Sequence, residues 1–231
     1  MSGHQSEDPA RQERARAAAA TPRYGRYVGL LAVLVLVALT IGVALTRSNG
    51  ATGIPPGQAV PPFAAPLASG TMKGDVNVAT HANQGAAGKT PACAVRGAGV
   101  LNVCELYERR PVVLALFVDA GSCPAVLADL QALAREFPGV SFAAVAIKGE
   151  RGSLRRLIRE RRLTNVAVGF DSDGVLASMY RLASCPQLTF VLPGGAVQSA
   201  AILSRPPLAT LRARVGELVA AAKARGWKAP A

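Results

Sequence analysis

Two cysteines stand at positions where sulfur chemistry is favoured. Cys123 follows an apolar run, residues 112–118, and precedes Pro124 and a helix-like stretch. A thiol at such a strand-to-helix turn lies near the unpaired N–H groups and the positive end of the helix dipole, which favour the thiolate. Further along, Cys185 and Pro186 precede a second strand-like run, residues 188–192. This arrangement predicts a nucleophilic sulfur at Cys123.

Other chemistries lack the residues that they need. A cysteine or serine hydrolase requires a base, and the chain has two histidines, His4 and His81, neither of which lies in a catalytic motif. Zinc sites lack ligands for the same reason. The net charge of +12 is dispersed over the N-terminal region, residues 148–162 and the C-terminal helix. Nucleic-acid binding is therefore not predicted, and the basic face of residues 151–162 is interpreted as solvated.

An uncharged apolar segment, residues 28–46, predicts a membrane anchor. At about 1.5 Å per helical residue it nearly crosses a hydrocarbon core of about 30 Å. A cleaved signal peptide is the alternative, but its apolar region is usually only about 7 to 15 residues long. Five arginines precede the segment, whereas Arg47 and Lys73 alone follow within reach. This asymmetry predicts a cell-membrane protein with a cytoplasmic N-terminus. All four cysteines then lie outside the membrane, where disulfides persist.

The predicted organisation has five parts: a cytoplasmic basic tail (1–26), a transmembrane helix (27–46), a linker (47–56), an extracytoplasmic domain (57–226) and a short tail (227–231). Within the domain, strand patterns at 112–118, 140–147 and 166–170 alternate with helix patterns at 124–136, 153–162 and 174–182. Two more strands, 187–192 and 196–203, flank Gly194 and Gly195, and a helix follows at 207–225. The pattern predicts an α/β domain with a mixed sheet, ending in a hairpin and covered by helices on both faces.

The order of strand, cysteine turn, helix and later residue-Pro dipeptide before a hairpin resembles the thioredoxin fold. Residues 57–70 and 106–113 are similar to the corresponding segments of the membrane-anchored redoxins, the TlpA-like and ResA-like thiol-disulfide oxidoreductases. The resemblance covers most of residues 57–225, including the extra helix-strand unit at 153–170. It implies a cis peptide bond before Pro186, which would shape the substrate groove.

The chain departs from that family at the active site. The family carries Trp-Cys-x-x-Cys, whereas this chain has Cys123-Pro124-Ala125-Val126, so Val126 occupies the position of the usual resolving cysteine. A mixed disulfide on Cys123 cannot then be cleared by a neighbour three residues on. The resemblance implies that Cys185, which precedes the family's cis-proline position, faces Cys123 and substitutes. The alternative is that Cys185 is a small buried residue.

The remaining cysteines, Cys93 and Cys104, are best paired with each other, although four cysteines allow three pairings. The segment between them is interpreted as two short strands around a glycine-containing turn. Closing a loop of this size contributes about 3 kcal/mol in the chain-entropy model. We therefore expect a structural disulfide.

Two acidic segments are interpreted as structural. Asp119 lies four residues before Cys123 and is interpreted as a solvated loop residue, with a proton relay to the thiol as the alternative. Asp171 and Asp173 resemble a calcium loop only superficially, and an N-cap for the following helix is expected instead.

The sequence thus predicts a thiol-disulfide oxidoreductase with Cys123 as nucleophile, Cys185 as resolving cysteine and no cofactor. Its expected partners are protein thiols or disulfides outside the membrane. Two alternatives remain. One is a redox-inactive thioredoxin-fold module that binds a partner protein. The other is a peroxiredoxin-like peroxidase, for which Leu116 and Ala120 stand where that family's Pro and Thr would be.

Overall fold

The computed structural model describes residues 24–48, 52–77 and 90–229. The chain divides into two units, one ending at Gly50 and one beginning at Ala51, and each is described by itself. The first 23 residues of the expected cytoplasmic tail lie outside the described residues, as do His4 and His81.

The first unit contains helix α2 (Tyr24–Ser48), which includes the whole uncharged apolar segment. Its described side chains are exposed, among them Leu30 at 60% and Leu34 at 62%. Among the helices formed by the described residues, none is both long and apolar enough to cross a membrane. The membrane anchor stays a prediction.

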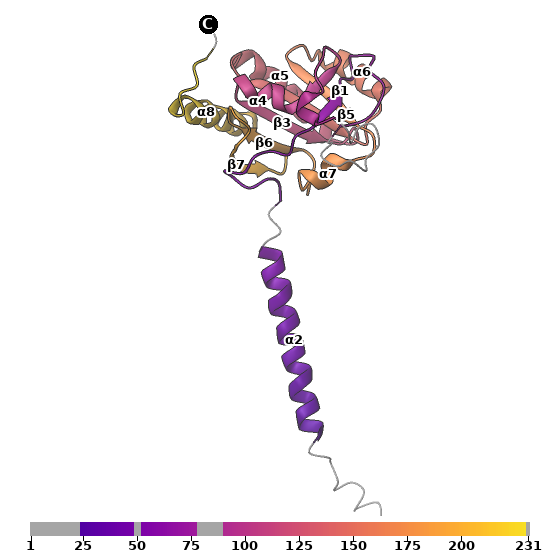
Figure 1. Ribbon diagram of the computed structural model, residues 1–231, viewed down its shortest axis with the longest axis vertical. Helices are drawn as coiled ribbons and strands as arrows, with labels where there is room; N and C mark the ends of the chain where they lie inside the picture. Colours follow the sequence, from indigo (N-terminus) through magenta and orange to yellow (C-terminus); the bar gives the residue numbers. More distant parts are fainter. Residues whose placement is uncertain (1–23, 49–51, 78–89, 230–231) are drawn as a thin grey trace, which may run out of the picture. The chain divides into compact units, whose positions relative to one another are not determined.

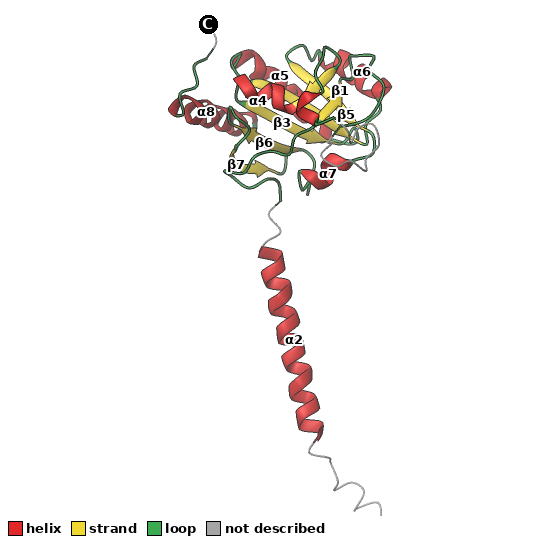
Figure 2. Cartoon of the chain, viewed as in Figure 1, coloured by secondary structure: helices red, strands yellow, loops and turns green. Residues whose placement is uncertain are grey.

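The second unit is built on a five-stranded sheet (Figures 1 and 2). Its strand order is β5-β4-β3-β6-β7, with bounds β3 (Val112–Phe117), β4 (Ser141–Ile147), β5 (Val166–Asp171), β6 (Gln187–Val191) and β7 (Val197–Ile202). Strands β3, β4 and β5 are parallel, whereas β6 is antiparallel to both β3 and β7. The expected mixed sheet with a final hairpin is confirmed.

Helices cover both faces of this sheet because the strand side chains alternate between two apolar layers. One layer contains side chains from α5 (Val126–Glu136), α6 (Arg151–Arg161) and α8 (Leu208–Ala224). The opposite layer contains side chains from α4 (Val103–Arg109) and α7 (Val175–Met179). All six residues of β3 are buried, which places this strand at the centre of the domain.

The segment that carries the first two cysteines differs from the expected pair of strands. Cys93 lies on a short 3-10 helix, η1 (Ala92–Ala94), and Cys104 lies in the first turn of α4. Strand β2 (Val100–Asn102) pairs with β1 (Ala64–Pro66) instead of with the chain around Cys93. The buried side chain of Asn102 explains the difference, because it accepts hydrogen bonds from the N–H groups of Cys104 and Glu105 and so caps α4. Its amide group also donates to the carbonyls of Ala92 and Val95.

Helices α6 and α7 also depart from their expected bounds. Helix α6 begins at Arg151, two residues earlier than expected, and its basic face is not wholly solvated. Arg155 donates to the carbonyls of Ala68 and Gly70, and Arg151 donates to those of Gly70 and Met72. Helix α7 ends at Met179, because Arg181 adopts a left-handed backbone conformation with φ of 50°.

The disulfide between Cys93 and Cys104 has Cα atoms 5.4 Å apart and closes a loop with a sequence separation of 11. We expect the Cys93→Ala, Cys104→Ala double variant to lose about 3 kcal/mol of unfolding free energy, because the unfolded chain regains the entropy of the open loop. Thermal or denaturant unfolding measures the loss, and thiol exchange at Cys123 should persist. An unchanged melting temperature combined with lost exchange would reverse the structural assignment.

Candidate functional site

Cys123 lies beyond the carboxyl end of the central strand, at the start of a helix. It begins the 3-10 turn η2 (Cys123–Ala125), which runs directly into α5. Pro124 fits the first turn of such a helix, since its missing N–H has no partner to lose there. The sulfur therefore lies at the end of a helix where the positive pole of the helix dipole favours an anion.

Cys185 is brought to the same place by the pairing of β6 with β3. Gln187, two residues after Cys185, lies opposite Leu116 near the end of β3. The Cys185–Pro186 peptide bond is cis, and Pro186 is buried. The structure joins Cys123 and Cys185 in a disulfide with Cα atoms 5.6 Å apart, inside the usual range of about 4.4 to 6.8 Å.

One backbone amide donates to both sulfurs. The N–H of Val118 lies 3.0 Å from Sγ of Cys185 and 3.4 Å from Sγ of Cys123. When a disulfide opens, one sulfur leaves as a thiolate, and a donor to that anion stabilises it. Sequence reasoning missed this group, because a main-chain donor carries no side-chain signature.

The surroundings of the disulfide are apolar and partly open. Cys123 is 8% exposed, whereas Cys185 is only partly buried and packs against the edge of the same apolar layer. The side chain of Val118 beside them is exposed at 38%. Val126, in the family's usual position of the second cysteine, is fully buried. The arrangement can present a disulfide to a thiol-bearing chain at the surface.

Asp119 is neither free in solvent nor bonded to a sulfur among the described contacts. Its carboxylate accepts a hydrogen bond from the hydroxyl of Ser153, near the start of α6. This contact ties the loop after β3 to α6. The expectation of a merely solvated aspartate is therefore wrong.

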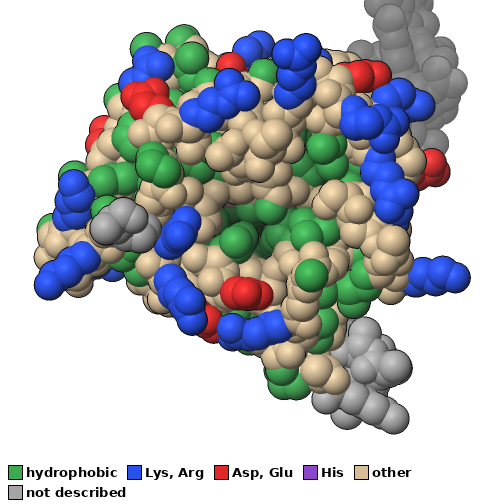
Figure 3. All heavy atoms as spheres, turned by 90° about the horizontal axis from the view of Figure 1, so that it is seen from above, with side chains coloured by type: hydrophobic (Ala, Val, Ile, Leu, Met, Phe, Trp, Pro, Cys, Tyr) green, Lys and Arg blue, Asp and Glu red, His purple; other side chains and the backbone are tan. Residues whose placement is uncertain are grey.

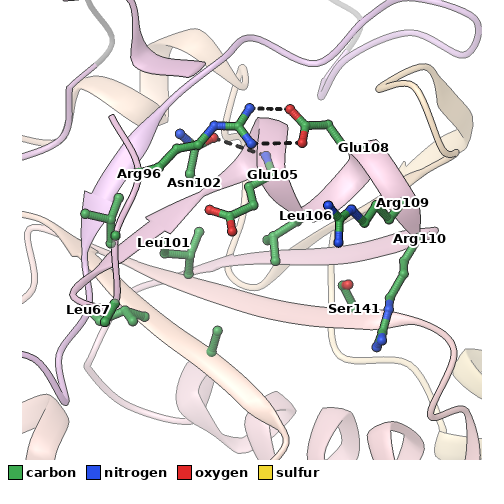
Figure 4. A pocket seen from close by; sticks show the side chains of 14 residues that line it. Leu67, Arg96, Leu101, Asn102, Glu105, Leu106, Glu108, Arg109, Arg110 and Ser141 are labelled. Atoms are coloured by element: carbon green, nitrogen blue, oxygen red, sulfur yellow. Dashed lines mark hydrogen bonds and ion pairs between the residues drawn. The ribbon is translucent and has the colours of Figure 1, made fainter. Parts of the chain in front are cut away.

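Two cavities formed by the described residues lie away from the two sulfurs. A cavity of about 500 Å³ is lined by residues from β2, α4 and the amino ends of β4 and β5, including Leu101, Leu106 and Ser141. Since β3 and β4 are parallel, this is the opposite end of the sheet from Cys123. Arg96 at its rim is engaged by Glu108 through two hydrogen bonds (Figure 4). Figure 3 shows, on one face of the molecule, a hollow with hydrophobic side chains inside and basic ones around it.

Three carboxylates gather near α7, namely Asp75, Asp171 and Asp173. Each accepts main-chain hydrogen bonds. Asp171 accepts hydrogen bonds from the N–H groups of Gly174 and Leu176, although the N-cap residue of α7 is Gly174 and not the expected aspartate. Asp75 accepts hydrogen bonds from the N–H groups of Ser172 and Asp173. The cluster is thus explained by its role in shaping the turn before α7.

The comparisons with known proteins show the fold. No protein-family model matches the sequence, and no curated protein matches it. Among solved structures, a thiol:disulfide interchange protein of the thioredoxin family from Chlorobium tepidum is similar, with a TM-score of 0.52, 11% identity and coverage of 72% of this chain and 98% of the other. The fold is thioredoxin-like.

Two further structures agree with that fold. The thioredoxin domain of a thiol-disulfide oxidoreductase from Bacteroides vulgatus has a TM-score of 0.51 and 14% identity, with 72% of this chain and 99% of that chain covered. Peroxidoxin BcpB from Mycobacterium tuberculosis has a TM-score of 0.51 and 15% identity, with 74% and 97% covered. The same fold therefore occurs in proteins named for two different sulfur chemistries.

The buried carboxyl of Asp171 provides a test of this region. Burial raises its pKa to about 6, and the neighbouring Asp173 side chain adds to the effect. Since the folded pKa exceeds the unfolded value of about 3.9, the stability that the proton provides is full below about pH 4 and is lost as the pH rises through 6. The loss is on the order of 3 kcal/mol.

We expect the unfolding free energy of wild type, measured relative to that of Asp171→Asn, to fall by that amount from pH 4 to pH 7 in denaturant unfolding, because the amide of the variant does not titrate. Asp173→Asn should move the transition to lower pH, because it removes one cause of the raised pKa. A difference that stays constant with pH would contradict the assignment.

Proposed function

We propose that this protein is a thiol-disulfide oxidoreductase whose redox-active pair is Cys123 and Cys185. The observation that carries the proposal is the disulfide that joins the start of η2 to the turn before β6, at the carboxyl end of β3, with the Val118 amide directed at both sulfurs. The fold shared with thiol-disulfide oxidoreductases supports it.

In the reducing direction, the Cys123 thiolate attacks one sulfur of a substrate disulfide. A bond forms between Cys123 and that sulfur, the substrate S–S bond breaks, and the other substrate sulfur leaves as a thiolate. Cys185, as a thiolate, then attacks Sγ of Cys123 and releases the second substrate thiolate. The enzyme ends with the Cys123–Cys185 disulfide and the substrate has gained two electrons. A dithiol reductant returns the enzyme to its starting state, and the reverse sequence oxidises a substrate dithiol.

Each step has a group suited to it. The start of η2 and α5 favours the anionic form of Cys123, so this sulfur is both the better nucleophile at neutral pH and the better leaving group. The Val118 amide lies within hydrogen-bonding distance of whichever sulfur carries the charge. Pro186 follows Cys185 directly and borders the site where a substrate chain would lie.

A protein-binding module without redox activity is the second candidate. The observation that favours it is the burial of Cys123, since a cysteine residue that is only 8% exposed resembles those of inert structural disulfides. In that function the apolar surface around Val118 would contact a partner, and the disulfide would hold the surface in shape. A peroxidase function has less support, because Leu116 and Ala120 replace the groups that would polarise a peroxide.

We further propose that residues 27–46 anchor the protein in the cell membrane, with the domain after Arg47 outside it. Support comes from the uncharged sequence of residues 28–46 and from the arginines before it. The two disulfides also suit a compartment in which thiols are oxidised.

The redox assignment is tested by trapping. In Cys185→Ser the Cys123 thiolate still attacks a disulfide substrate, but no internal sulfur releases it, so mixed disulfides with oxidised glutathione should accumulate on Cys123. Cys123→Ser should form no adduct under the same conditions, and the Cys93→Ala, Cys104→Ala variant serves as the control that still turns over. Peptide mapping by mass spectrometry reads the adducts. No adduct on Cys185→Ser, with a wild-type disulfide that resists dithiothreitol, would favour the binding module.

The topology is tested with a protease added outside intact cells. We expect the domain after Arg47 to be degraded while a cytoplasmic marker protein survives, because the positive flank keeps the N-terminus inside. Immunoblotting with antibodies against each end of the chain shows which part has been degraded. Protection of the domain in intact cells, together with its degradation after lysis, would overturn the orientation.

A further inference from the structure

Helix α5, which directly follows the 3-10 turn that begins with Cys123, forms an ion pair near each of its ends. Near its start, Arg205 donates to Asp129 through two hydrogen bonds, of 2.6 Å and 3.0 Å. At its end, Arg212 donates to both carboxylate oxygens of Glu136, at 2.9 Å and 2.8 Å. Asp129 is 9% exposed, whereas Glu136 is exposed. The two pairs are alike in chemistry and differ in burial and in distance from the sulfur.

Arg205 belongs to a short loop between β7 and α8 that contacts both sides of the redox pair. Two residues before it, the carbonyl of Leu203 accepts a hydrogen bond from the hydroxyl of Ser184, the neighbour of Cys185. Arg205 itself binds Asp129, in the first turn of α5. The loop therefore links α5, which follows the turn that carries Cys123, to the residue before Cys185, without using the disulfide.

Asp129 lies on the run of helix that begins at Cys123. Six residues separate them, which at about 1.5 Å per helical residue is about 9 Å along the axis. Because Asp129 is buried, solvent screens its charge less than it would at the surface. An unpaired carboxylate there would oppose a thiolate at Cys123, as like charges do. Two further titratable groups belong to this region: Asp119, which accepts a hydrogen bond from Ser153 and precedes Cys123 by four residues, and Cys185 itself.

We propose that Arg205 is a positioning residue for the redox pair. By pairing with Asp129 it neutralises the one buried carboxylate in the first turn of α5 and so preserves the thiolate-stabilising field at Cys123. This inference rests on the proposed function, since it assigns to Arg205 an influence on the reduction potential of the Cys123–Cys185 couple. A thiolate that is less stable makes the reduced form less stable, and the couple then becomes a weaker oxidant.

The proposal makes the two single variants move in opposite directions. Arg205→Gln leaves Asp129 unpaired and should raise the pKa of reduced Cys123 by about half a unit, which slows its alkylation at neutral pH about threefold. Asp129→Asn leaves the Arg205 cation unpaired and should lower that pKa. The double variant should return close to wild type. Loss of a merely structural contact would move both single variants in the same direction.

The experiment uses the full chain. The pH dependence of Cys123 alkylation is measured in a Cys185→Ser background, and the reduction potential of the couple is measured against glutathione with both cysteines present. Arg212→Gln is the matched control, since it breaks the similar pair at the far end of α5, and it should leave both quantities unchanged. Arg205→Lys keeps the charge and should stay close to wild type even if Arg205→Gln folds poorly.

Opposite shifts for the single variants, with Arg212→Gln unchanged, support the proposal. Shifts of the same sign, no shift in either, or an equal shift in Arg212→Gln overturn it. Failure of the proposed function is seen separately, in wild-type protein whose Cys123–Cys185 disulfide does not exchange with glutathione.

Discussion

The candidate site depends above all on the antiparallel pairing of β6 with β3. Cys123 and Cys185 are 62 residues apart in the chain, and neither element alone could bring them together. The register that sets Gln187 opposite Leu116 places the turn before β6 next to the loop after β3. Because strand side chains alternate with a period of two, a slip of one residue would move the buried faces of both strands as well as the sulfur. The hydrophobic core therefore holds the geometry of the disulfide.

Sequence reasoning recovered the sheet because its signals are local. The fully apolar run of β3 predicts a buried strand, and the Gly194–Gly195 pair predicts the turn of a hairpin. The parallel connections follow from the alternation of strands with helices. The same reasoning failed between Cys93 and Cys104, where glycines suggested a hairpin. There the deciding group is Asn102, whose side chain bonds to four main-chain groups and starts α4 instead. One buried amide outweighed the turn pattern.

The parts of the site that sequence reasoning missed are long-range or belong to the main chain. Asp129 and Arg205 lie 76 residues apart, and nothing in either local pattern marks them as partners. The donor at Val118 is a backbone N–H, present at every residue except proline, so only the fold can direct it at two sulfurs. The cysteines themselves could be found because their residue type is rare and their flanking elements are distinctive.

A disulfide that joins two neighbouring elements at one end of the sheet differs physically from one contained in a single helical turn. In a Cys-x-x-Cys motif both sulfurs belong to one helical turn, so opening that disulfide removes no covalent link between separate elements of the fold. Here the bond joins the start of α5 to the turn before β6, and reducing it removes a covalent link between two elements. The contacts of the loop after β7, from Leu203 to Ser184 and from Arg205 to Asp129, connect the same two regions without using the sulfurs. In the proposed function, sulfurs held near each other in the reduced state would let the second thiolate attack the mixed disulfide at a high effective concentration. A buried valine in place of the usual second cysteine is then compatible with exchange chemistry.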